Sequence, residues 1–122
     1  MNYLSAIIFV FLGGGFGSLS RFGIGKLSSF FSATRFPIGT LVANSLACII
    51  LGITIFYLKE KIESSHFIKY FIVIGFCGGF STFSTFSLET VNLFKDGLLL
   101  FGILNIVVSM SLAFVILWIL AK

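Results

Sequence analysis

The sequence predicts an all-α membrane protein with four transmembrane helices, the third of them broken. Of its 122 residues, 58% are hydrophobic and only 10% are charged, and the mean hydropathy is +1.17. Soluble domains carry roughly 25% charged residues. Four uncharged runs are each near the ~20 residues that cross ~30 Å of hydrocarbon: residues 1–20, 36–58, 70–88 and 97–121. They occupy nearly the whole chain, so we expect one transmembrane domain over residues 1–122, with spans at about 3–28, 36–58, 67–91 and 97–121.

The first run contains a cluster of glycines. No Lys or Arg precedes its apolar core and no small-residue cleavage pattern follows it, so we expect a retained helix rather than a signal peptide. Gly13 and Gly17 lie four residues apart, on a face that another helix can approach closely. Arg21 comes just past this face, at the membrane boundary.

The second run begins behind Pro37, which suits the first turn of a helix. Asn44 is the only strongly polar side chain in this run. A buried amide needs partners for both its NH2 group and its carbonyl oxygen. A hydrogen bond to another helix and a donor aimed at a passing anion are equally compatible with the sequence.

The third run carries the most information, at residues 75–86. Its glycines free backbone carbonyl groups and its hydroxyl side chains need partners, which a helix that only faces lipid would not contain. Phe rings have partly positive edges, so rings and hydroxyl groups together can replace the hydration shell of an anion. The glycines predict a helix break, and two facing breaks would offer carbonyl oxygens to a hard cation such as Na⁺. Two stripes at helical spacing run through this segment: Phe76, Phe80, Phe83 and Phe86, and Ser81, Ser84 and Thr85.

The fourth run repeats the polar theme with Asn105 and Ser109, one helical turn apart. A local or interhelical hydrogen bond is slightly favoured for this pair over a role in transport. Residues 95–97, Lys-Asp-Gly, predict a tight turn ahead of this helix. Glu89 closes the third span, and we expect it to be a solvated helix end.

Basic residues are balanced between the two sides of the membrane. The positive-inside bias that orients most membrane proteins is therefore close to zero, which predicts that the chain inserts in both orientations. Four helices hide little polar surface, so we expect the chain to associate, and insertion in both orientations would permit a two-fold dimer with its axis in the membrane plane. The net charge of +4 is typical of residues that flank membrane spans and predicts no nucleic-acid partner. One side carries Lys59, Lys61, Lys69 and Lys122, and the other carries Arg21, Lys26, Arg35 and Lys95.

No arrangement typical of an enzyme is present in the sequence. It contains neither a His/Asp/Ser set nor a Cys/His set, and no pair of carboxylates falls within the spans. Cys48 and Cys77 have neither a disulfide framework nor the spacing of metal ligands. We therefore expect a protein without catalytic activity.

Three stretches of the sequence resemble the Fluc (CrcB) family of bacterial fluoride channels, and the resemblance extends over essentially the full length. They are residues 13–22, residues 39–44 and residues 75–86, the last similar to the family signature Gly-Phe-x-Gly-Gly-x-Thr-Thr-Phe-Ser-Thr-Phe. The resemblance implies a multi-pass protein of the bacterial inner membrane that exports fluoride passively and so reduces its toxicity in the cytoplasm. It also implies an antiparallel homodimer within the lipid bilayer.

The resemblance further implies roles for individual residues. Arg21 would attract anions toward the vestibule, and the backbone carbonyls of Gly78 and Ser81 from each subunit would hold a structural Na⁺ at the dimer interface. Asn105 stands where the family usually has a Tyr that lines the pore. The fluoride pathway would be formed by Asn44, Phe83, Phe86, Ser84, Thr85, Ser109 and Asn105.

Two other functions fit a four-span chain of this size. A proton-coupled exporter like the small multidrug resistance proteins depends on a buried Glu in its first helix, but residues 1–20 contain no acidic residue. A membrane subunit without transport activity would use its polar residues only to join helices, and it would be silent in flux assays.

Overall fold

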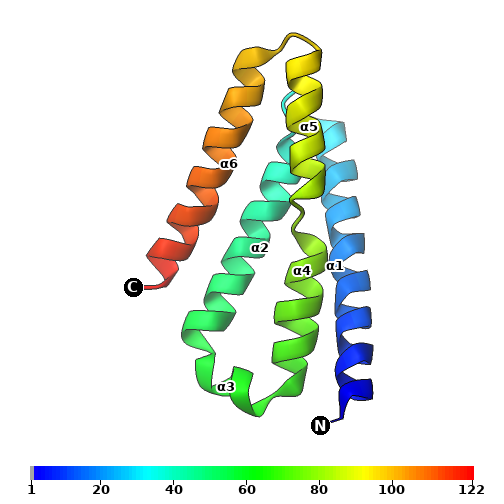
Figure 1. Cartoon of the computed structure of the whole chain (residues 1–122), viewed down its shortest axis with the longest axis vertical. Coiled ribbons are helices and arrows are strands. Elements are labelled where there is room, and N and C mark those ends of the chain that lie inside the picture. Colours follow the sequence, from blue (N-terminus) through cyan, green and yellow to red (C-terminus); the bar gives the residue numbers. More distant parts are fainter. Residues whose placement is uncertain (1) are drawn as a thin grey trace.

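The computed structural model describes residues 2–122, and the regular structure of this part of the chain is helical. The long helices lie side by side along the length of the molecule, and the short α3 joins α2 to η1 at one end (Figure 1). In chain order the elements are α1 (Tyr3–Phe31), α2 (Ile38–Tyr57), α3 (Lys59–Ser64), η1 (Phe67–Cys77), α4 (Gly78–Phe80), α5 (Ser84–Lys95) and α6 (Leu99–Leu120).

Within residues 2–122, four helices are long and apolar enough to cross a membrane: α1, α2, the third span Phe67–Lys95, and α6. This result confirms the predicted four transmembrane helices. α1 continues to Phe31 rather than residue 28, and the third span continues to Lys95 rather than residue 91. The third span is broken, as predicted, because residues 81–83 separate η1 and α4 from α5 (Figure 1).

Local hydrogen bonds define the helix ends. The Asn2 side chain accepts a hydrogen bond from the Ser5 N–H at 2.9 Å and caps α1. Pro37 is the residue immediately before α2. Between α5 and α6, Gly97 has a φ of +78°, a left-handed conformation that glycine adopts without strain. The tight turn predicted at residues 95–97 is therefore confirmed.

A seam of glycines joins α1 to the third span. Gly13 and Gly17 are buried on α1, and Gly75 is buried on η1. A methyl group on Gly13 or Gly17 would overlap backbone carbonyl groups of the third span, and one on Gly75 would come within 2.9 Å of the Val10 carbonyl oxygen. The two helices thus pack at backbone distance, which is the close approach predicted from the spacing of Gly13 and Gly17.

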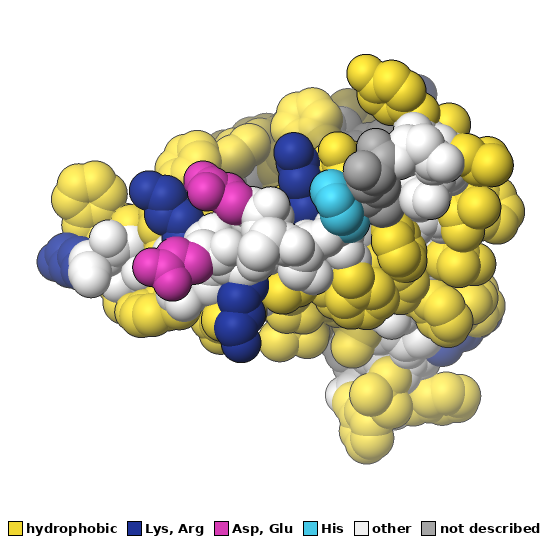
Figure 2. All heavy atoms as spheres, turned by 90° about the horizontal axis from the view of Figure 1, so that it is seen from below, with side chains coloured by type: hydrophobic (Ala, Val, Ile, Leu, Met, Phe, Trp, Pro, Cys, Tyr) yellow, Lys and Arg dark blue, Asp and Glu magenta, His cyan; other side chains and the backbone are white. Residues whose placement is uncertain are grey.

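The buried core is small and most of the outer surface is apolar. Ala43 and Ala47 of α2 and Phe80 of α4 form the core cluster. Large side chains such as Phe11 and Trp118 are 77% and 70% exposed. Seen from the end that carries α3, Lys, Glu and His side chains gather over that end and hydrophobic side chains surround them (Figure 2). This distribution suits an apolar flank in lipid and a charged end in water.

We expect Gly17→Ala to destabilise the protein by about 1–3 kcal/mol, because the added methyl group overpacks the seam against rigid backbone. Gly15→Ala is the matched control, since a methyl group at Gly15 meets no atom within 4 Å. Thermal unfolding of both variants in detergent measures the difference. Equal melting temperatures for the two variants would contradict the close packing of α1 against the third span.

Candidate functional site

The site is built around the break in the third span, at residues 81–83. Ser81 has an extended conformation, with φ −80° and ψ 157°, which ends the preceding helix. Its N–H and hydroxyl groups both donate to the Cys77 carbonyl, at 3.1 and 2.8 Å. The Thr82 hydroxyl accepts from the Thr85 N–H at 3.1 Å and so caps the start of α5. A hydroxyl side chain thus bonds to the Thr85 N–H, one of the backbone groups that the break exposes.

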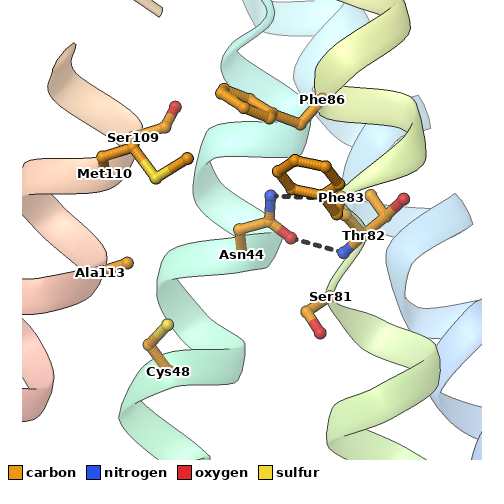
Figure 3. A pocket seen from close by; sticks show the side chains of 9 residues that line it. All are labelled: Asn44, Cys48, Ser81, Thr82, Phe83, Phe86, Ser109, Met110 and Ala113. Carbon is orange, nitrogen blue, oxygen red and sulfur yellow. Dashed lines mark hydrogen bonds between the residues drawn. The ribbon is translucent and has the colours of Figure 1, made fainter. Parts of the chain in front are cut away.

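Asn44 of α2 binds the backbone of the break with both ends of its amide. Its Oδ1 accepts from the Thr82 N–H at 2.7 Å, and its Nδ2 donates to the Thr82 carbonyl at 3.1 Å (Figure 3). In an uninterrupted α-helix, the Thr82 N–H would bond to the Gly78 carbonyl instead. An amide NH2 group carries two hydrogens, so Asn44 keeps one for a further acceptor. Its interhelical hydrogen bonds are therefore compatible with a donor role toward an anion.

The helix end before the break presents carbonyl groups without partners. Among residues 2–122, no hydrogen bond reaches the carbonyl oxygen of Gly78 or Ser81. Gly78 is exposed, and a methyl group on it would meet no atom within 4 Å. Neutral carbonyl oxygens are the ligands that a hard cation prefers. Both residues line a cavity of about 200 Å³, together with Ala47, Cys48, Leu51, Val73 and Cys77.

Arg21 of α1 lies at the same helix end, where its Nε donates to the Gly79 carbonyl at 3.3 Å. A cation is favourable near the carboxyl end of a helix. Arg21 also lines a cavity of about 340 Å³ that includes Lys26, Thr40 and Thr85. Among the residues described by the structure, no carboxylate lines this cavity, so its field attracts anions.

A cavity of about 230 Å³ lies between α2, the break and α6 (Figure 3). It brings together four of the predicted pathway residues: Asn44, Phe83, Phe86 and Ser109. The ring centroids of Phe83 and Phe86 are 5.9 Å apart; Phe86 is 7% exposed, whereas Phe83 is 72% exposed. Within the described chain the lining contains donors and aromatic rings but no carboxylate. The other lining residues are Cys48, Ser81, Thr82, Met110 and Ala113.

The three remaining pathway candidates lie outside this cavity. Ser84 is exposed, with its hydroxyl 3.3 Å from that of Thr82. Thr85 lines the cavity of Arg21 instead. Asn105 is 2% exposed and donates to the Thr90 hydroxyl at 2.9 Å. The roles of these three residues in a pathway stay predictions.

Two residues of the site have positions that the sequence pattern does not indicate. Thr82 supplies the backbone groups that Asn44 binds. The sequence indicates a role for Thr82 only through its place among the glycines and hydroxyl residues of residues 75–86. Glu89 is half-buried, and its Oε1 is buried without a hydrogen-bond partner in residues 2–122. The expectation of a solvated helix end is wrong for Glu89, because the connection between α1 and α2 encloses a cavity of about 260 Å³ beside it, shared with Thr40.

Comparison with known proteins confirms the resemblance found in the sequence. Residues 8–120 match the family model described as CrcB-like protein, Camphor Resistance (CrcB). A relative from Ruminiclostridium cellulolyticum is 39% identical over 111 residues, which cover 91% of this chain and 85% of the relative. A relative from Coxiella burnetii is 34% identical over 113 residues (92% and 91%), and one from Phocaeicola vulgatus is 42% identical over 96 residues (78% and 78%). All three relatives are named Fluoride-specific ion channel FluC. The family model and the relatives agree over most of the chain, and the protein belongs to the CrcB family.

Proposed function

We propose that this protein is a fluoride-specific channel of the bacterial cytoplasmic membrane that lets fluoride leave the cell passively. The observation that carries the proposal is the cavity beside the helix break, where Asn44, Phe83, Phe86 and Ser109 meet. The relatives named as fluoride channels, and not as enzymes, support the same function. The four apolar spans make the protein a multi-pass membrane protein.

The chemistry of this cavity suits a small, strongly hydrated anion. Fluoride gives up water only where other donors replace it, and the cavity offers the second Nδ2 hydrogen of Asn44 and the edges of two Phe rings. Several sites of moderate strength allow an ion both to enter and to leave. Because no carboxylate of the described chain lines the cavity, the anion meets no fixed negative charge there, and the proposed movement needs no coupled proton.

Arg21 and Lys26 support a vestibule for the same ion. Their cavity, which Thr85 shares, collects positive charge and hydroxyl groups close to the break. A cleft lined by charges of one sign raises the local concentration of the opposite ion. In this proposal Arg21 and Lys26 concentrate fluoride, and the residues of the main cavity replace its water.

Two antiparallel copies would complete the pathway. Phe83 borders the cavity but is 72% exposed in one chain, and Gly78 is exposed beside it. The unpaired carbonyl groups of the helix break are costly to leave facing lipid, so a partner surface is expected there. The equal numbers of basic residues on the two sides support a partner of the opposite orientation.

The carbonyl oxygens of Gly78 and Ser81 fit a Na⁺ ion at this interface. They have no hydrogen-bond partner among residues 2–122 and border one cavity, and a neutral oxygen set suits a hard monovalent cation. When bound, the cation would contribute positive charge that offsets the charge of the anion. Asn44 keeps the Gly78 carbonyl free by accepting the hydrogen bond of the Thr82 N–H. The Thr82 hydroxyl does the same for the Ser81 carbonyl by accepting from the Thr85 N–H.

The direct test is fluoride efflux from liposomes that contain the purified protein, without a proton gradient. We expect fluoride to leave much faster than from empty liposomes, with chloride retained, because the cavity provides donors for a small anion. Ion-selective electrodes measure both ions. Folded protein that releases no fluoride, or releases chloride equally fast, would overturn the proposed function.

Replacement of either cavity ring should lower fluoride efflux while the fold is kept. Phe83→Ile and Phe86→Ile each remove an aromatic edge, and an aromatic interaction of about 0.5–1.5 kcal/mol corresponds to a fall of up to about tenfold. Phe114→Ile is the control, because Phe114 of α6 is 68% exposed and borders none of the described cavities. Efflux equal to that of the control in both cavity variants would show that the rings are not on the path.

A further inference from the structure

α6 packs against α2 and α5 but buries few of its own side chains. Within the described chain, its buried residues are Gly102 and Asn105, and most of its other side chains are exposed. Gly102 packs against the ring of Phe94 on α5. Of the two buried residues, Asn105 is the one with a polar side chain, and it is 2% exposed. Asn105 therefore provides the buried polar contact of α6 with α5.

A chain of hydrogen bonds runs through Asn105 from one wall of the main cavity to the other. The Ser109 hydroxyl donates to Asn105 Oδ1 at 3.2 Å, and Asn105 Nδ2 donates to the Thr90 hydroxyl at 2.9 Å. The Thr90 hydroxyl donates to the Phe86 carbonyl at 2.8 Å. Ser109 lines the cavity from α6, and Phe86 lines it from α5. The chain thus connects the two residues across the bundle.

The direction of these bonds follows from the number of hydrogens. A hydroxyl group has one hydrogen, and Thr90 donates it to the Phe86 carbonyl, so its oxygen is left to accept from Asn105. Ser109 likewise directs its single hydrogen to Asn105 Oδ1. Asn105 satisfies both neighbours because its amide has a donor at one end and an acceptor at the other. An apolar residue at this position would satisfy neither neighbour.

We propose that Asn105 is a positioning residue that fixes the separation of Phe86 and Ser109 and, through it, the discrimination of fluoride against the larger chloride ion. This inference rests on the proposed channel function and deepens it. Asn105 does not border the cavity, so it acts through the two residues that do. A cavity in which Phe86 and Ser109 are held at a fixed separation excludes a larger ion. A cavity in which this separation can increase admits it.

The test compares fluoride and chloride efflux for variants of this chain. Asn105→Leu removes the side-chain hydrogen bonds to Thr90 and Ser109 with little change of volume. The Ser109 hydroxyl can then donate to the backbone carbonyl of residue 105. Thr90→Val removes the hydroxyl at nearly constant shape, and Thr90→Ser restores it. Ser111→Ala is the control, because Ser111 is an exposed hydroxyl residue of α6 outside the cavity.

We expect Asn105→Leu and Thr90→Val to lower the fluoride-to-chloride efflux ratio by about 3- to 20-fold, which is the range expected from one hydrogen bond within a membrane. Thr90→Ser and Ser111→Ala should keep the wild-type ratio. The double variant should be no worse than the more affected single variant, because both changes break the same chain. A residue with only a structural role would change the melting temperature and leave the ratio unchanged.

An unchanged ratio in Asn105→Leu and Thr90→Val would overturn the inference, whatever their stability. The inference would also be overturned if Thr90→Ser lowered the fluoride-to-chloride efflux ratio as much as Thr90→Val, because the hydroxyl group would then not matter. If one single variant does not fold, the other variant and the double variant decide. Absence of fluoride efflux from the wild-type protein would instead refute the proposed function, and that result is separate from a changed ratio.

Discussion

The bond between the Asn44 amide and the backbone of Thr82 is the interaction on which the rest of the site depends. A helix break within a membrane leaves polar backbone groups that water cannot reach, and each unsatisfied group costs several kcal/mol, on the order of 2–7. Asn44 satisfies the N–H and the carbonyl of Thr82 together. In doing so it leaves the Gly78 carbonyl without its helical partner and allows α5 to start anew, with Phe83 and Phe86 beside the cavity.

The break is closely packed on one side and exposed on the other. Glycines let α1 approach the third span at backbone distance, so the helix end with the Gly79 carbonyl, to which Arg21 of α1 donates, is held firmly. On the opposite side, Phe83 and Gly78 are exposed. Within the described residues, α6 buries only Gly102 and Asn105, which contact Phe94 and Thr90 of α5. The rigid half suits the support of a fixed site, and the open half suits a second copy of the chain.

Local features of the sequence predicted the fold well, because span length, hydropathy and the glycine spacing act within single helices. They also predicted the members of the cavity that lie next to the break. Contacts between distant helices could not be derived this way: Asn44 and Thr82 are 38 residues apart, and no spacing rule links Asn105 to Thr90. The expected Phe stripe is divided by the break into two ring pairs, Phe76 with Phe80 and Phe83 with Phe86, since helical spacing does not continue through an extended residue.

If Asn44 creates the path by holding the break open, loss of its amide should abolish transport, and fluoride efflux by Asn44→Leu is the measurement that decides. Leucine has a similar volume but can bind neither group of Thr82. The measurement compares this variant with wild-type protein in liposomes, after the size of the detergent-solubilised assembly has been shown to be the same. We expect fluoride efflux to fall to the level of empty liposomes. Wild-type efflux from the Asn44→Leu protein would show that Asn44 does not create the path.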